Sequence, residues 1–149
     1  MTTYLTRPAE LLDLVGEQLG TTDWCQITDE RVNLFADATG DYRSIPFPPP
    51  RTAAAFENVV ASGYLTLSLL PRPLGDLLTI DSPPEAVEYG LNEVRFPTPA
   101  RVGTKVRCTG RKLAVQRFEA GLEAVFGVTF ESEDAVRPLC VAEPVVIYR

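Results

Sequence analysis

The chain has 149 residues, of which 45% are hydrophobic and 23% are charged, as in an ordinary soluble globular protein with one core. It has no apolar run of about 18 residues that would span a membrane, and its first residues lack the basic and apolar regions of a signal peptide. The net charge of −6 argues against nucleic acid as a partner, because phosphate backbones are bound by basic surfaces. We therefore expect a single cytoplasmic domain that spans residues 1–149.

The absence of histidine is the most restrictive feature of the composition. Without an imidazole, the chain cannot form a Ser-His-Asp triad, a Cys-His dyad or a His-ligated zinc site. It also has no glycine-rich loop of the kind that holds a nucleotide phosphate, and its three cysteines form no CxxC pair. We expect reduced thiols, no metal and no cofactor.

Two helices are predicted in the first 40 residues. Residues 8–20 place Leu11, Leu12, Val15 and Leu19 at helical spacing between Pro8 and Gly20, which predicts a helical extension within residues 1–23. A short strand is expected at 24–27. A second helix is expected from its N-cap, Thr28, to Gly40, with a core side formed by Val32, Phe35, Ala36 and Ala38.

The middle of the chain combines a proline-rich loop with an apolar helix. Four prolines in residues 41–52 indicate an ordered, extended loop, because proline restricts both its own backbone and that of the preceding residue. Residues 53–70 are apolar on nearly all sides, which predicts a long buried helix that ends before Pro71 and Pro73. Gly63 inside this helix indicates close approach by another group.

From residue 85 onward the hydrophobic period changes to two. Strands are predicted at 87–96, 104–118, 121–131 and 138–148. The third strand has Leu122, Ala124, Phe126, Val128 and Phe130 on one face, as expected for a half-buried antiparallel strand. One long helix against one antiparallel sheet is an α+β domain.

Residues 95–118 contain seven basic residues and no acidic residue. Two interpretations remain open. The basic side chains either form a solvated strand face or bind the phosphates of coenzyme A or an acidic carrier protein.

Three stretches, in this order, resemble the MaoC-like (R)-specific enoyl-CoA hydratase and dehydratase family, in its nodulation-protein-N-type branch. They are residues 27–45 (ITDERVNLFADATGDYRSI), 59–71 (VVASGYLTLSLLP) and 89–107 (YGLNEVRFPTPARVGTKVR). With the following strands, the resemblance covers about residues 24–149. It implies a hot-dog fold, in which an antiparallel sheet wraps around a long central helix. It also implies a homodimer with an acyl-CoA or acyl-carrier-protein substrate.

The same resemblance implies where the catalytic groups lie. In that family, an aspartate and a histidine five positions later activate water, and an N–H beside a glycine at the head of the central helix polarises the thioester carbonyl. Asp41 and Gly63 match the aspartate and the glycine, but Pro46 stands at the histidine position. The histidine often found before the glycine is Ser62 here.

Loss of the imidazole leaves two interpretations of function. The first is an acyl-thioester lyase with altered or weakened chemistry (a dehydratase, isomerase or cyclase) that uses Asp41, Gly63, Ser62 and Glu57, the acid at the entrance to the central helix. The second is an inactive hot-dog protein that binds an acyl ligand or supports an active subunit. In both, the expected substrate-binding residues are Tyr42, Arg43, Asn58, Tyr64, Asn92 and Arg95.

Overall fold

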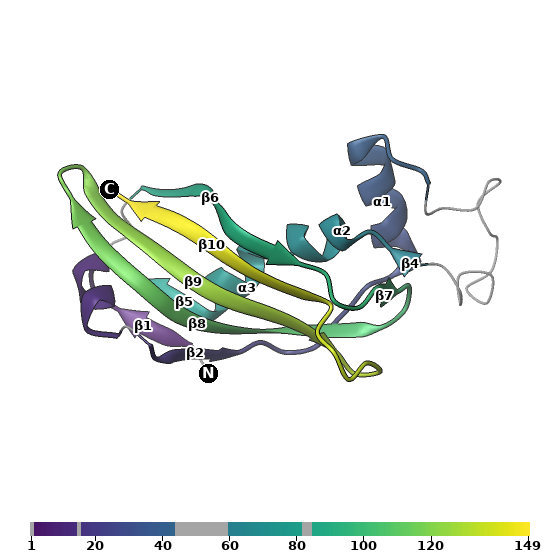
Figure 1. The fold of residues 1–149 in the computed structure, drawn as a ribbon, viewed down its shortest axis with the longest axis horizontal. Coiled ribbons are helices and arrows are strands. Elements are labelled where there is room, and N and C mark those ends of the chain that lie inside the picture. The colour runs from purple at the N-terminus through teal and green to yellow at the C-terminus, as the bar shows by residue number, and fades with distance from the viewer. Residues whose placement is uncertain (1, 15, 44–59, 82–84) are drawn as a thin grey trace.

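A computed structural model describes residues 2–14, 16–43, 60–81 and 85–149. A curved antiparallel sheet forms most of the molecule, with the helices on one side and beyond one end of it (Figure 1). Its strand order is β2-β8-β9-β10-β6, and the short strand β3 also pairs with β8. The bounds are β2 Gln18–Thr21, β3 Cys25–Gln26, β6 Ala86–Arg95, β8 Lys105–Phe118, β9 Gly121–Ser132 and β10 Cys140–Tyr148. The fold is α+β, as predicted.

The three long C-terminal strands confirm the prediction from the period of two. β9 buries every second residue, including all five apolar residues assigned to its inner face. Because side chains alternate across a strand, this face packs on the helices while the other face remains partly exposed. Two apolar clusters result, one under the central helical segment around Phe130 and one near the N-terminal segment around Phe126.

The helix α1 (Asp29–Thr39) begins and ends where the sequence predicts. The Thr28 side chain accepts a hydrogen bond from the N–H of Arg31, and Gly40 ends the helix in the left-handed conformation with a φ of 72°. Val32 and Ala36 are buried and Phe35 is partly buried, but Ala38 is exposed, so its assignment to the core side is wrong.

The long helix expected over 53–70 is not what the structure shows in its described part, residues 60–70. Val60–Ala61 forms β4, which pairs with β7 (Ala100–Arg101), and α2 occupies only Gly63–Ser68. A second short helix, α3 (Pro71–Leu77), follows at once. The helix α2 ends before Pro71, as expected, and Pro71 then begins α3, because proline lacks only an N–H that the first turn leaves unpaired anyway. Residues 53–59 lie outside the described part of the chain.

The structure also corrects the prediction of a helix over 8–20. Pro8–Leu14 forms a 3₁₀ helix, η1, and Gln18–Thr21 is the strand β2, with Gly20 at a φ of 130°. Leu11 and Leu19 are both buried, so the apolar spacing correctly indicated burial but not helix. The N-terminal strand β1 (Thr3–Leu5) pairs in parallel with β5 (Leu78–Ile80).

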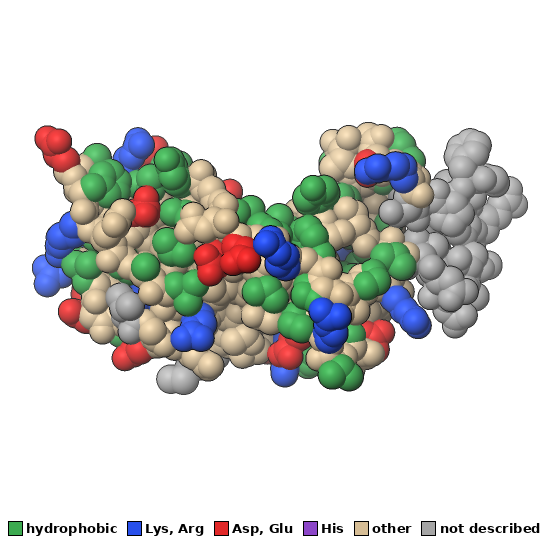
Figure 2. Space-filling model, in the orientation of Figure 1, with side chains coloured by type: hydrophobic (Ala, Val, Ile, Leu, Met, Phe, Trp, Pro, Cys, Tyr) green, Lys and Arg blue, Asp and Glu red, His purple; other side chains and the backbone are tan. Residues whose placement is uncertain are grey.

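The basic segment does not form one uniform surface. Arg95, Arg101, Lys105, Arg111 and Arg117 are exposed, but Lys112 is completely buried. On the face drawn in Figure 2, basic side chains are scattered among acidic and hydrophobic ones. Among the described helices, none combines the length and apolar character needed to cross a membrane.

Candidate functional site

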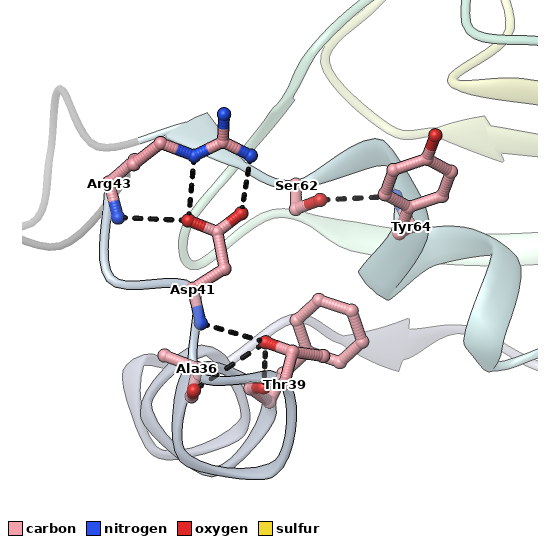
Figure 3. Close-up of polar contacts among 7 residues, drawn as sticks. Ala36, Thr39, Asp41, Arg43, Ser62 and Tyr64 are labelled. Carbon is pink, nitrogen blue, oxygen red and sulfur yellow. Dashed lines mark hydrogen bonds and ion pairs between the residues drawn. The ribbon is translucent and has the colours of Figure 1, made fainter.

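Asp41 lies directly after α1, where Gly40 turns the chain away from the helix axis (Figure 3). Its Oδ1 accepts hydrogen bonds from the backbone N–H of Arg43 (3.1 Å) and from Nε of Arg43 (2.8 Å), and its Oδ2 accepts one from Nη2 (2.8 Å). These hydrogen bonds to the Arg43 side chain and backbone lower the pKa of Asp41 to about 2. The carboxylate is therefore ionised at neutral pH and already paired.

Ser62 and Gly63 form the start of α2. The Ser62 side chain accepts a hydrogen bond from the N–H of Tyr64 (3.2 Å) and so caps the helix. Gly63 is the first helical residue, and N–H groups in a first turn have no partner within their own helix. A donor at this position is therefore available to an oxygen of a ligand.

A pocket of about 350 Å³ opens at this helix start. Ser62, Gly63 and Tyr64 line it from α2, and Phe96 lines it from the segment after β6. Its other described lining residues are Val60, Ala61, Thr66, Thr98, Pro99, Ala100 and Leu139. The structure thus brings three of the predicted site residues together around one cavity.

Gly63 is required by this packing. A Cβ atom at Gly63 would lie 2.8 Å from two ring carbons of Phe96, closer than real Cβ contacts come. The same ring meets Tyr64 edge to face, with ring centroids 5.8 Å apart. The close approach that the glycine indicated in the sequence is therefore made by the ring of Phe96.

Asp41 forms no hydrogen bond with any described residue that lines this pocket. In Figure 3, the Asp41–Arg43 pair and the Ser62–Tyr64 cap are separate groups of contacts. Tyr42 is exposed, and its hydroxyl donates to Oδ1 of Asp37 at 2.7 Å. Glu57, Asn58 and Pro46 lie outside the described residues.

Asn92 and Arg95 lie on the exposed strand β6. Val94 pairs with Ala142 and Leu91 with Pro144, so Asn92 and Glu93 together lie opposite the single residue between those partners. This is a β-bulge, which bends a strand and redirects its side chains. Arg95 forms an exposed ion pair with Glu93 at 3.5 Å.

Sequence reasoning missed Phe96, Thr66 and Leu139 as pocket residues. Thr66 is almost fully buried although it is polar, and Leu139 precedes β10. The signal in the sequence was Gly63, a glycine inside an apolar segment. It indicated that another group approaches the backbone closely there, but it did not identify that group. Among the described residues, no cluster of three or more Cys, Asp or Glu side chains is arranged to hold a metal ion.

The arrangement of the sheet and the helices defines a hot-dog protein, as solved structures confirm. The (R)-hydratase from A. caviae involved in PHA biosynthesis superposes with a TM-score of 0.68 at 22% identity, covering 91% of this chain and 96% of that one. The family model described as "MaoC like domain" matches residues 11–131. The chain belongs to the MaoC-like domain family.

The similarity to known proteins extends over nearly the whole chain. The chain is 44% identical over 142 residues to 3-hydroxyacyl-thioester dehydratase Z of Mycobacterium tuberculosis, covering 94% of each protein. It is 33% identical to Nodulation protein N of Rhizobium leguminosarum bv. viciae, covering 93% of this chain and 89% of the relative.

Proposed function

We propose that this protein is a lyase that adds water to, or removes it from, an enoyl or 3-hydroxyacyl thioester carried by coenzyme A or a carrier protein. The observation that carries this proposal is the 44% identity, across 94% of both chains, to a protein named 3-hydroxyacyl-thioester dehydratase Z. Asp41 and Gly63 stand at the family's aspartate and glycine positions and support the same activity.

In this proposal, the thioester carbonyl binds at the start of α2. The N–H of Gly63 donates to the carbonyl oxygen and stabilises the negative charge that develops there during reaction. The pocket beside it is lined largely by apolar side chains, and a bound acyl chain that covers them would exclude water and strengthen that hydrogen bond. Ser62 keeps the helix start in place through its cap.

Asp41 serves as an acceptor that orients the water or the substrate hydroxyl. Its pKa of about 2 makes it a weak base, and it has no proton to donate at neutral pH. The chain has no histidine, so a different group must supply the acid, and Glu57 is our candidate. Loss of one general acid–base partner costs about 10²–10⁴-fold in rate, so we expect slow turnover.

The Asp41–Arg43 pair favours a second candidate function. A carboxylate whose two oxygens both accept from one guanidinium is not free to hold a water molecule. A protein in this state would bind an acyl thioester without converting it, or support an active subunit. An enzyme would have to separate this pair when substrate binds.

Enoyl absorbance distinguishes these functions. The purified protein is incubated with crotonyl-CoA and with longer trans-2-enoyl-CoAs, and we expect measurable loss of absorbance only with the longer ones. Asp41→Asn should abolish this activity, while Glu30→Gln on the exposed side of α1 should not change it. Full activity in Asp41→Asn would remove Asp41 from the mechanism. Binding without turnover in the unmodified protein would favour the second function.

A further inference from the structure

A larger cavity, of about 790 Å³, lies away from the proposed catalytic pocket. It lies between β2, β3 and β8 on one side and the end of α2 with α3 on the other. Gly63 at the start of α2 lines the first pocket, whereas Ser68 and Leu69 at its end line this second one. Among the described residues, the two cavities share no lining residue. We call this second cavity the edge cavity.

The floor of the edge cavity reaches the apolar core. Leu77, Val106 and Phe130 line it, and each exposes no more than 2% of its surface. Leu69 and the buried Cys108 extend the same floor. A cavity of this size with an apolar floor falls in the usual range for small-molecule sites, about 300–1,000 Å³.

Three arginines from three different elements line the same cavity: Arg31 from α1, Arg72 from α3 and Arg107 from β8. Arg107 is held in place, because its Nε lies 2.8 Å from Oε1 of Glu131 and its guanidinium lies 4.5 Å from the ring centre of Trp24. Arg72 has only a loose, exposed ion pair with Asp76, at 3.6 Å. Arg31 forms no ion pair with any described residue.

Two of the three arginines can meet an anion. Asp23 and Asp76 of the lining, with Glu131 beside it, match the three arginines in number, so the site has no excess charge. Arg31 has no ion pair with a described residue and Arg72 has only a loose one, so these two guanidinium groups are available to a ligand. Guanidinium groups bind carboxylates with two parallel hydrogen bonds, which makes arginine well suited to a single anionic group.

We propose that the edge cavity is a second binding site, for an unbranched acyl chain that ends in a carboxylate. The acyl chain lies on the apolar floor, and the carboxylate meets Arg31 and Arg72 at the mouth. This site does not depend on the proposed lyase activity, since neither Asp41 nor any described residue of the catalytic pocket lines it.

The position of Trp24 provides a direct test. It is the only tryptophan of the chain, it lines the edge cavity and it is 43% exposed, so its fluorescence reports occupancy. Titration with decanoate, below the concentration at which it forms micelles, should give a saturable change. Affinity should rise roughly threefold to fourfold for each added methylene until the cavity is filled. Decanol should bind at least fivefold more weakly, because it lacks the charge.

Substitutions test whether the charges of Arg31 and Arg72 contribute to the binding of decanoate. Arg31→Gln and Arg72→Gln should each raise the Kd for decanoate about fivefold to tenfold and leave that for decanol unchanged. Arg117→Gln, on an exposed part of β8 outside the cavity lining, is the matched control and should change neither. Asp41→Asn should bind decanoate normally, which keeps this test independent of the lyase proposal.

Four results would overturn the proposal. They are the absence of a saturable decanoate signal, equal affinity for decanol and decanoate, insensitivity to both arginine substitutions, and displacement of decanoate by adenosine 3′,5′-bisphosphate at lower concentration. The last result would assign the cavity to a nucleotide instead.

Discussion

The carboxylate of Asp41 and the guanidinium of Arg43 are two residues apart and form two side-chain hydrogen bonds. Because this pairing favours the charged form, the pKa of Asp41 falls from its ordinary 3.8 to about 2. The lowered pKa of Asp41 stabilises the folded state. This contribution to the free energy of unfolding is present above the unfolded pKa, near pH 4, and is lost as the pH falls toward 2.

NMR titration of the Asp41 carboxyl carbon should therefore give a pKa near 2, and Arg43→Gln should return it toward 3.8. Arg72→Gln, which removes a different exposed ion pair, should leave it unchanged. A value near 4 in the unmodified protein would show that the pair does not form in solution.

Lys112 is fully buried on the inner face of β8, and its Nζ has no hydrogen-bond partner among the described residues. Burial lowers its pKa, while the nearby charges of Glu17 and Asp13 act in the opposite direction. A lowered pKa means that the folded state disfavours the ammonium form of Lys112. The free-energy cost of burying this charge reduces the stability of the fold in full below the folded pKa, and it disappears as the pH rises toward the unfolded value, near 10.5.

Lys112→Met should therefore stabilise the protein at pH 7, by about 1–3 kcal/mol, because it replaces a buried charge with an apolar side chain of similar shape. Urea unfolding measures the change, and Lys105→Met, at an exposed position on the same strand, is the control. A loss of stability in Lys112→Met would mean that the ammonium group has an effective partner.

At the level of elements, the start of α2 depends on the contact between Gly63 and Phe96. A methyl group at residue 63 would displace the ring, and overpacking of this kind costs about 1–3 kcal/mol. We expect Gly63→Ala to destabilise the protein by this amount, as measured by urea unfolding.

The same substitution in a Phe96→Ala background should cost less than about 0.5 kcal/mol, because the clash is gone and alanine is the better helix former. Equal costs in both backgrounds would show that the ring does not limit residue 63.

The elements also show how far the sequence could predict this fold. The strand β9 was predicted because alternating apolar residues cover one face only, β8 and β10 because they continue the same strand-like region, and α1 because Thr28 and Gly40 provide specific caps. The helices predicted over 8–20 and 53–70 are only partly confirmed in their described parts, because η1 and α2 cover six or seven residues each and β2 and β4 take the place of the rest. In both segments apolar residues correctly indicated burial, but strand pairing with β8 and β7 decided the local conformation.

The site could also be predicted only in part, because the sequence pattern does not show which distant residues the fold brings together. Ser62, Gly63 and Tyr64 come together because they are consecutive in the chain. Phe96 lies more than thirty residues away and reaches the pocket only through the fold. The proposed roles of Asp41, Asn92 and Arg95 remain predictions.

At the scale of the whole molecule, β6 is the last strand of the sheet, and nearly all its residues are exposed. Tyr89 and Leu91 are exposed apolar side chains on this edge strand. Exposed edges of this kind readily pair with another strand. We propose a homodimer that pairs through β6.

Light scattering after size exclusion should give a mass of two chains, and Tyr89→Lys with Leu91→Lys should shift it to one, because like charges would face each other across a twofold axis. Phe118→Lys, at an exposed position on β8, should leave the assembly unchanged. A monomeric unmodified protein would exclude the pairing.

The bulge at Asn92 and Glu93 also affects how tightly β6 is held. Next to it, β10 carries Pro144, which pairs with Leu91 and cannot donate a backbone hydrogen bond, so the ladder between the two strands is interrupted there. We therefore expect backbone amides on the two sides of this interruption to exchange with deuterated water as two separate groups rather than as one. The end of β6 leads into Phe96, so opening of that end alone would move one wall of the proposed catalytic pocket.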